Sequence, residues 1–323
     1  MHVIQTRTRK TEQAYLNKAN QLIQRANSEL GPSGNEISAS QFVKWLVSNK
    51  PNWSKATWRQ YIAACSNAFG DCFTNELAKH DLPPSKKCSD QTSALKFKKL
   101  PPEDLERLVI HLEQKSAKAK SRSDVPSAAF AAMLLTCGTL TGLRPIEWAN
   151  ASIQVSPDRS FFRVCVQNAK NTNGRAHGKA RSIPMENQCD DLLSSIEILI
   201  GYVQLLQKTD VFERKVGSAR RALCNANKEL WPRRKKRYTL YSARHQAAAN
   251  WKQFLLLEEI AALMGHFSSK TASTHYGRRS AGRSKILPGP YPAICPFPNP
   301  AEVARVKVPT KNIAHANVGP LDR

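Results

Sequence analysis

Hydrophobic residues in the first part of the chain recur every three or four positions. This spacing places them along one face of a helix, where they can meet neighbouring helices. The aromatic residues of the segment fall on the same face, so we expect them to form a core rather than to stack on bases. Residues 1–85 therefore predict a small helical N-terminal bundle. The prediction rests on Phe42, Trp45, Leu46, Trp58, Ile62, Cys65 and Phe69.

Residues 86–100 differ in composition from the segments on either side. They lack a sustained apolar period and lie between two pairs of prolines, residues 83–84 and residues 101–102. Paired prolines at both ends of a segment without an apolar period are typical of a linker between domains. The segment is also basic, which suits a linker that runs along phosphates.

A second, larger domain is expected over residues 101–282. It is predicted to be mainly α-helical, with a small β-hairpin sheet. Apolar strands at residues 161–167 and 181–185 flank a polar and basic segment, which predicts a hairpin with a long tip. Helical periods predict helices at residues 103–113, 126–140, 192–206, 242–251 and 258–264.

The last segment, residues 283–323, is rich in proline and basic residues and lacks a strong helical period. This composition predicts an extended tail. Two roles remain open for it at this point: docking onto a neighbouring protomer, or plain disorder.

The charge of the chain indicates the class of partner. There are 49 Lys and Arg residues against 25 Asp and Glu residues, a formal net charge of +24. So large a surplus indicates binding to a polyanion, and nucleic acid is the polyanion expected. The basic run Arg233, Arg234, Lys235, Lys236 and Arg237 is a candidate DNA contact. A solvated loop and a localisation signal are its alternatives.

Other classes of protein are not expected. The longest uninterrupted apolar run, residues 128–135, is far shorter than the ~18 residues of a membrane span. The first residues carry no apolar signal region, so we expect an intracellular, cytoplasmic protein associated with DNA and not with a membrane. The eight cysteines form no C-x-x-C pair, which predicts neither a disulfide framework nor a metal site.

Four separate segments carry side chains suited to attack on a phosphodiester. They are TGLRPIEW around Arg144, QNAKN around Lys170, YSARHQ around Arg244, and MGHFSSKTASTHYGRR, which holds His266 and Tyr276. The first segment is the most informative. A proline follows its arginine, which favours a turn there and a helix that starts at residue 145. Glu147, about one turn further on, is placed to hold the arginine side chain in one rotamer.

This ordered set resembles the tyrosine recombinase (phage integrase) family over residues 100–279. The resemblance implies a two-domain DNA clamp, formed by a helical core-binding domain and a catalytic domain. It makes Tyr276 the nucleophile that attacks the scissile phosphate, forms a 3′-phosphotyrosine and frees a 5′-hydroxyl. It implies that no metal ion or cofactor is required. It also implies a homo-tetramer assembled on double-stranded DNA.

The family's other functional residues carry over to matching positions. Arg144 and Arg244 correspond to the arginines that bind the non-bridging phosphate oxygens, and His266 to a hydrogen-bond donor to the same phosphate. Lys170 matches the lysine that serves as general acid, with Lys179 on the returning strand as its rival. The remaining candidates are Glu147 and His245, which support the arginines, and Arg278 and Arg279, which follow the nucleophile as phosphate contacts.

Two features depart from the family pattern. The second arginine block usually begins with histidine, whereas Tyr241 occupies that position in this chain. A phenol still donates a hydrogen bond, but it is a poor proton shuttle near neutral pH because its ordinary pKa is ~10. In addition, Tyr276 follows His266 by ten residues, one more than in the commonest family pattern.

The resulting interpretation is a site-specific recombinase or integrase that cuts and rejoins DNA for integration or excision of a mobile element. Two alternatives stay open at this stage. One is a DNA-binding protein that keeps the recombinase-like cleft without cleavage. The other is a relaxing enzyme similar to type IB topoisomerases.

Overall fold

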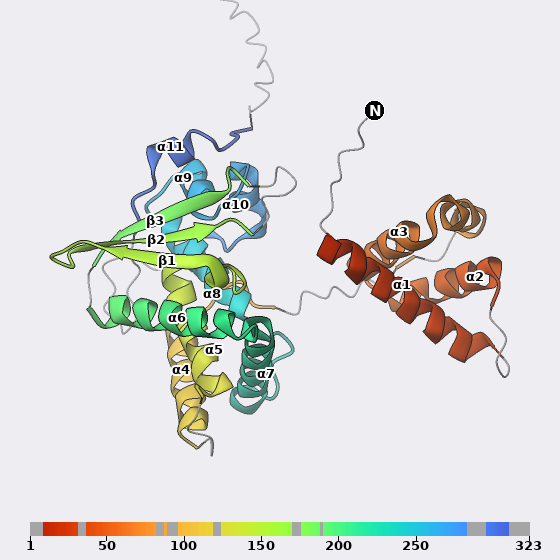
Figure 1. Cartoon of the computed structure of the whole chain (residues 1–323), viewed down its shortest axis with the longest axis horizontal. Helices are drawn as coiled ribbons and strands as arrows, with labels where there is room; N and C mark the ends of the chain where they lie inside the picture. Colours follow the sequence, from red (N-terminus) through yellow and green to blue (C-terminus); the bar gives the residue numbers. More distant parts are fainter. Residues whose placement is uncertain are drawn as a thin grey trace, which may run out of the picture. The chain divides into compact units, whose positions relative to one another are not determined.

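The computed structural model divides the chain into two compact units, Met1–Leu95 and Lys96–Arg323. It describes residues 9–31, 37–81, 87–88, 96–118, 124–169, 176–187, 190–282 and 295–309. Figure 1 shows a mainly helical chain with a single small antiparallel sheet, which lies in the second unit. The predicted fold class is confirmed.

In its described residues, the first unit is a bundle of three helices: α1 (Arg9–Leu30), α2 (Ala39–Asn49) and α3 (Lys55–His80). A serine side chain caps each of the last two helices by accepting a hydrogen bond from a backbone N–H, Ser38 at α2 and Ser54 at α3. The predicted aromatic face is the core. Phe42 and Trp45 are buried and stacked on each other at 6.2 Å between ring centroids.

The second unit is built around α5 (Ser127–Thr141), whose sequence is apolar on all sides. It packs against α4 (Pro102–Ala117), α6 (Asp190–Lys208), α7 (Phe212–Leu230) and α8 (Leu240–Trp251). A helix that is hydrophobic all round must be covered on every face, and these four neighbours cover it. The unit continues with α9 (Leu257–Leu263) and α10 (Ser269–His275).

One of these helices, α7, was not predicted from the sequence, which indicated only a basic segment from residue 213 onward. Its buried side chains include Phe212, Val216, Ala219 and Leu223, at helical spacing among charged residues. The amphipathic period was therefore present in the sequence. The many charged residues between the apolar positions made this period hard to recognise.

The sheet has three strands: β1 (Ala151–Val155), β2 (Phe161–Gln167) and β3 (Ala180–Glu186), antiparallel in that order. The two strands predicted are β2 and β3, with Val164 opposite Ile183. The third, β1, was missed because it is short. It follows a single 3₁₀ turn, η2 (Glu147–Asn150), where the sequence predicted a longer helix from residue 145.

The tail prediction is wrong for residues 295–309, which pack on the second unit. The backbone N–H of Phe297 donates to the carbonyl oxygen of Pro184 at 2.8 Å, and a short helix, α11 (Pro300–Val303), follows. Glu302 is buried and accepts hydrogen bonds from the N–H and the hydroxyl of Ser182 on β3. A buried carboxylate with satisfied partners and the buried Val306 anchor this strap despite its prolines. The rest of the tail lies outside the described residues.

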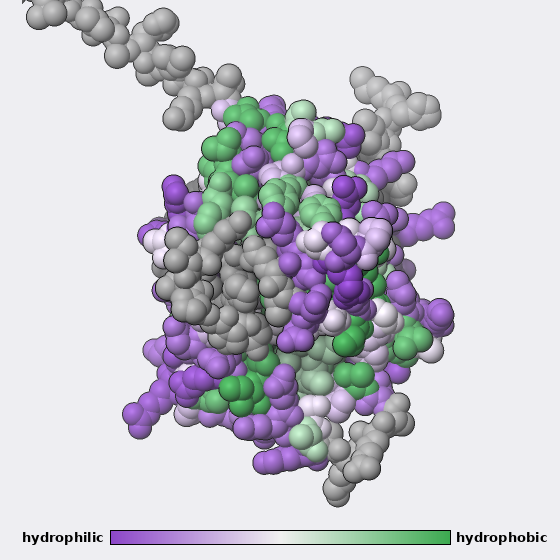
Figure 2. Space-filling model, turned by 90° about the vertical axis from the view of Figure 1, so that its left-hand side faces the viewer, coloured by the Kyte–Doolittle hydropathy of each residue, from purple (hydrophilic) through white to green (hydrophobic). Residues whose placement is uncertain are grey.

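Figure 2 shows a face of the molecule on which hydrophilic side chains prevail and hydrophobic ones lie in small separate groups. None of the described helices is long and apolar enough to cross a membrane. Within the described residues, no group of three or more His, Cys, Asp or Glu side chains is placed to hold a metal ion.

The turn that leads from α5 into the candidate site depends on Gly142. This glycine has φ of 64°, and a Cβ added to it would lie 2.8 Å from Trp251. We expect Gly142→Ala to lower the free energy of unfolding by about 2–4 kcal/mol, because it combines a left-handed backbone with overpacking. Urea denaturation followed by circular dichroism measures the change.

Gly201→Ala is the matched control, since a Cβ at this position in α6 would meet nothing within 4 Å. It should leave stability unchanged or raise it by about 0.5–1 kcal/mol, as expected for alanine in a helix. Equal stability of Gly142→Ala and the unmodified protein would contradict the packing described.

Candidate active site

Segments far apart in the sequence meet at one point of the second unit. Arg144 lies in the turn after α5, Glu147 lies on η2, and Arg244 lies on α8. His266 follows α9, and Tyr276 follows α10 directly. The five residues form one polar network, so the structure brings together the main candidates from three of the four predicted motifs.

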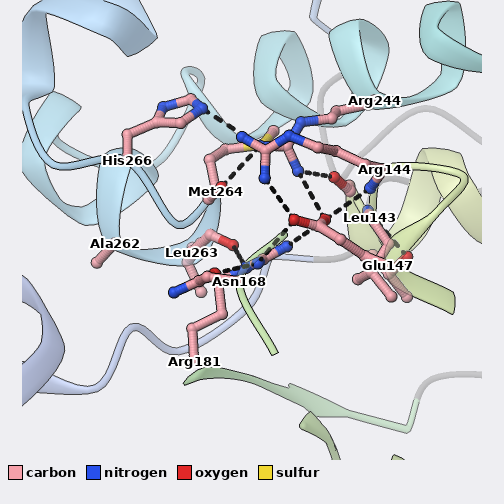
Figure 3. A network of polar contacts seen from close by, with 12 residues as sticks. Leu143, Arg144, Glu147, Asn168, Arg181, Arg244, Ala262, Leu263, Met264 and His266 are labelled. Carbon is pink, nitrogen blue, oxygen red and sulfur yellow. Dashed lines mark hydrogen bonds and ion pairs between the residues drawn. The ribbon is translucent and has the colours of Figure 1, made fainter. Parts of the chain in front are cut away.

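Glu147 is the centre of this network (Figure 3). Its carboxylate is fully buried and faces three guanidinium groups. It bonds to Arg144 through both the backbone N–H, at 2.8 Å, and Nη1. Burial raises the pKa of Glu147, but the charges of Arg181, Arg244 and Arg144 lower it more, so the pKa is well below its ordinary value. The carboxylate is therefore ionised, and it fixes the arginine side chains as the sequence predicted for Arg144.

The third guanidinium, Arg181 on β3, was not predicted as a site residue. Its side chain is fully buried. It donates from Nη2 to Glu147 at 2.9 Å, from Nε to the carbonyl oxygen of Leu263 at 2.7 Å, and from Nη1 to Asn168. The sequence carried no local signal for this role: Arg181 is the first residue of the predicted strand 181–185, next to the polar Ser182, and its buried partner Glu147 lies elsewhere in the chain.

Arg244 is fully buried, and each of its nitrogens has a partner in the protein. Nη1 donates to the carbonyl oxygen of Gly142 at 2.5 Å, and Nη2 donates to that of Met264 at 2.6 Å. Nε donates to the hydroxyl of Tyr276 at 3.0 Å. Burial lowers the pKa of Arg244. The family resemblance implied an arginine fork that is open to phosphate, but this guanidinium is held by the protein and by the candidate nucleophile.

Arg144 differs from Arg244 in this respect. Its side chain keeps 8% exposure, and its contact with Glu147 uses only one of its guanidinium nitrogens, Nη1. Within the described part of the chain, Nε and Nη2 of Arg144 have no hydrogen-bond partner. The arginine with donors to offer an incoming oxyanion is therefore Arg144.

His266 accepts hydrogen bonds through Nε2. This atom lies 3.2 Å from Nη2 of Arg244 and 3.1 Å from the Tyr276 hydroxyl. A guanidinium can only donate, so Nε2 must be unprotonated and the ring proton must be on Nδ1. Burial and the charges of Arg244 and Arg144 lower the pKa of His266 to about 2, which keeps the ring neutral. The resemblance implied a donor to phosphate, whereas in this structure Nε2 receives hydrogen bonds.

The turn before His266 requires glycine. Gly265 has φ of 68°, and a Cβ there would lie 2.2 Å from Asn168 Oδ1 and 2.9 Å from Arg181 Nη1. The backbone of this turn therefore presses directly against the arginine network. The predicted helix stop at this glycine is observed, because α9 ends at Leu263.

Tyr276 is half-buried, and its hydroxyl accepts from Arg244 while it donates to His266. The ring of His245 packs against the Tyr276 ring at 5.1 Å, although we expected it to support Arg244 from behind. Burial, with help from the charge of Lys98, lowers the pKa of His245 to about 4. Tyr241 lies one turn earlier on α8 and is 36% exposed; its hydroxyl bonds to none of the described residues.

The predicted basic contacts fall into two groups. Arg234 is engaged by the protein: it is ion-paired with Asp104 at 2.8 Å and lies over the rings of Trp231 and Phe97. Its assignment as a DNA contact stays a prediction. Arg237 is half-buried, with Nη1 bonded to the sulfur of Cys224. The exposed members are Arg233, Lys235, Lys236, Arg278 and Arg279.

Of the two lysines considered as general acid, Lys170 lies outside the described residues. Lys179 is exposed at the point where the chain enters β3, and its carbonyl oxygen accepts from the N–H of Asn168 at 2.8 Å. The choice between the two lysines remains a prediction.

No family model and no curated protein matches the sequence. Among the solved structures that are similar to it are two complexes of the XerH site-specific recombinase. The first, bound to a palindromic difH substrate in a post-cleavage complex, has a TM-score of 0.44 and 15% identity, over 86% of this chain and 76% of that one. The second, bound to difH in a pre-cleavage complex, has a TM-score of 0.42 and 16% identity, over 81% of this chain and 76% of that one.

The chain resembles a tyrosine recombinase. The sequence motifs led to this resemblance. The structure brings five residues of these motifs together at one site: Arg144, Glu147, Arg244, His266 and Tyr276. The chemistry proposed below depends on those residues.

Acid is expected to destabilise the second unit through two imidazoles, that of the buried His266 and that of the half-buried His245. In the unfolded chain each binds a proton near the ordinary pKa of 6.5, whereas folding lowers the pKa to about 2 for His266 and to about 4 for His245. The stabilisation is complete above pH ~6.5 and is lost as the pH falls toward the folded values. For each unit by which the pH falls below ~6.5, each imidazole lowers the free energy of unfolding by up to about 1.4 kcal/mol. Urea denaturation between about pH 7 and about pH 5 measures this slope.

Replacing His266 by glutamine should make the dependence on pH shallower. His275→Gln is the control, since His275 is exposed and lies beside Tyr276. An equally steep slope in His266→Gln and the unmodified protein would show that the buried imidazole is not its source.

Proposed function

We propose that this protein is a site-specific DNA recombinase that cuts and rejoins strands through a 3′-phosphotyrosine intermediate. One observation carries the proposal. The hydroxyl of Tyr276 lies 3.0 Å from Nε of Arg244 and 3.1 Å from Nε2 of His266, next to a buried group of guanidiniums. A phenol, a neutral imidazole and fixed cations are the groups that an attack on phosphorus requires.

The substrate class follows from the charge. The chain has a formal net charge of +24, and a surplus of this kind favours a nucleic acid backbone. Exposed basic side chains continue from the nucleophile at Arg278 and Arg279 and are found again at Arg233, Lys235 and Lys236. Double-stranded DNA is the proposed partner, with a homo-tetramer as the working assembly. Integration or excision of a mobile element is the proposed outcome.

Arg144 is proposed to bind a non-bridging oxygen of the scissile phosphate with the donors that Glu147 leaves unused. Arg244 holds the phenolic oxygen and contributes its charge from behind it. Removal of one such donor or charge typically costs about 10²- to 10³-fold in rate. His266 accepts the hydrogen bond from the phenol and so orients the oxygen toward the phosphorus.

In the proposed step, the Tyr276 oxygen gives its proton to solvent and forms a bond to phosphorus, while the bond from phosphorus to the 5′-oxygen breaks. The 5′-oxygen takes the electron pair of that bond and a proton, supplied by Lys170 or Lys179. Attack by a 5′-hydroxyl on the phosphotyrosine reverses the step and joins strands. Because the phosphoryl group is stored on the protein, the proposed step involves no cofactor.

A suicide substrate tests this proposal. We expect duplex DNA with a nick next to the cleavage site to trap a covalent protein–DNA adduct, because the short 5′-hydroxyl fragment is lost. Since the target sequence is not known, nicked duplexes cut from random plasmid DNA and from the DNA ends that flank the gene are the substrates. Denaturing gel electrophoresis detects the adduct, and mass spectrometry of the nucleotide-bearing peptide assigns it.

Tyr276→Phe should abolish the adduct and keep most of the duplex binding, because only the reacting oxygen is removed. Tyr202→Phe is the matched control: it removes a hydroxyl that bonds to Asp124, outside the site network, and the adduct on Tyr276 should still form. Tight binding without any adduct in the unmodified protein would instead favour a non-catalytic DNA-binding protein. Relaxation of any supercoiled plasmid would favour a topoisomerase.

A sulfur substitution can identify the general acid. We expect Lys170→Ala to slow cleavage by about 10²-fold or more, the usual contribution of general acid catalysis. With a 5′-bridging phosphorothiolate, the defect should largely disappear because a thiolate leaves without a proton. Single-turnover rates on matched oxygen and sulfur substrates measure the ratio. The same rescue in Lys179→Ala but not in Lys170→Ala would assign the role to Lys179.

A further inference from the structure

The buried network carries more positive than negative charge. Arg144, Arg181 and Arg244 are all buried, and Glu147 is the carboxylate that faces them. His266 is neutral, because it accepts a hydrogen bond from a guanidinium. Two positive charges are therefore left in excess in a site that is largely closed to water. Unpaired charge in such a site is costly until an anion compensates it.

Arg181 contributes to this excess without reaching the substrate. Its side chain has 0% exposure, and Nε, Nη1 and Nη2 all donate to protein oxygens, those of Leu263, Asn168 and Glu147. A residue that is saturated in this way can act only through its charge and through the groups that it holds. It lies on β3 and is held by these three partners, so its position is fixed before DNA binds.

We propose that Arg181 is a positioning residue whose positive charge is the second of the two in excess at the site. With both charges present, the site can bind a phosphodiester and also stabilise the phenolate that forms on Tyr276. The role rests on the proposed function. A phosphodiester carries one negative charge, and the Tyr276 oxygen acquires a second as its proton leaves. Two excess cations match these two anions. With Arg181 neutral, the phosphodiester alone would balance the site, and loss of the phenolic proton would need a higher pH.

The groups that face the nucleophile come from several elements. α8 provides Arg244 and His245, and the strap residue Glu302 bonds to Ser182, which follows Arg181 on β3. Successive side chains of a strand point to opposite faces, so the carboxylate of Glu302 and the guanidinium of Arg181 lie on different sides of β3. The remaining charged or titratable neighbours are Arg144, Glu147, His266, Lys98 and Lys252.

The experiment measures the rate of adduct formation against pH under single-turnover conditions at saturating DNA. Arg181→Gln should slow cleavage near neutral pH by about tenfold or more, and the pH of half-maximal rate should rise by about one unit or more. Arg181→Lys keeps the charge without the fork, so its half-maximal pH should stay near that of the unmodified protein. Arg163→Gln is the matched control, because it removes an exposed arginine from the neighbouring strand β2; it should change neither value.

A double variant separates charge from structure. Arg181→Gln combined with Glu147→Gln removes one charge of each sign and restores the excess of two. If charge is the role of Arg181, the half-maximal pH returns toward its original value even where the maximal rate is lower. If Arg181 only holds Glu147 in place, the double variant shows no return. Replacement of a buried ion pair by neutral groups is often tolerated, so the double variant also serves if Arg181→Gln does not fold.

Two results would overturn the proposal, and they are distinguishable. If the unmodified protein forms an adduct and the Arg181→Gln profile has the same half-maximal pH, the role of Arg181 is wrong while the proposed function stands. If the unmodified protein forms no adduct at any pH on DNA that it binds, the proposed function fails, and the role of Arg181 fails with it.

Discussion

The site depends on one buried interaction, the carboxylate of Glu147 among three guanidinium groups. A carboxylate that is removed from water must be ionised and paired, or it must take up a proton. Glu147 is paired with Arg144, Arg181 and Arg244, which come from the turn after α5, from β3 and from α8. A single side chain therefore ties the small sheet to two of the core helices. The same side chain sets the positions of the cations around the candidate nucleophile.

At two turns around this interaction, the backbone comes into close contact with the arginine side chains. Both turns contain a glycine with positive φ: Gly142 at the end of α5 and Gly265 at the end of α9. The carbonyl oxygen of Gly142 accepts directly from Arg244, and a Cβ on Gly265 would collide with Asn168 and Arg181. Backbone carbonyl oxygens therefore also hold the guanidiniums, by accepting hydrogen bonds from them. This explains how so much positive charge is accommodated with a single carboxylate facing it.

The sequence predicted much of this, and the failures have physical reasons. Helical periods located the N-terminal bundle and most of the second unit, and Arg144, Glu147, Arg244, His266 and Tyr276 were chosen from motifs before their proximity was known. Arg181 was missed because a buried ion network is a tertiary property: nothing local distinguishes a strand arginine with a buried carboxylate from one in solvent. The same reason explains why the contacts of Arg234 were not predicted: the basic run does not show that its guanidinium pairs with Asp104 and lies over aromatic rings.

The state of the nucleophile follows from how the donors of Arg244 are shared. Its Nη1 and Nη2 atoms are bound by carbonyl oxygens of the protein, and Nε is bound to Tyr276. A phosphate oxygen that binds at Nε must therefore share it with the phenol or displace the phenol from it. Arg144 has donors that are not used in this way, so in the proposed reaction the phosphate is bound first at Arg144, where no protein contact must be broken. In the proposed reaction the Tyr276 hydroxyl, already fixed by Arg244 and His266, then meets the phosphorus with little reorganisation, and such preorganisation is a large part of what a fixed site contributes to rate.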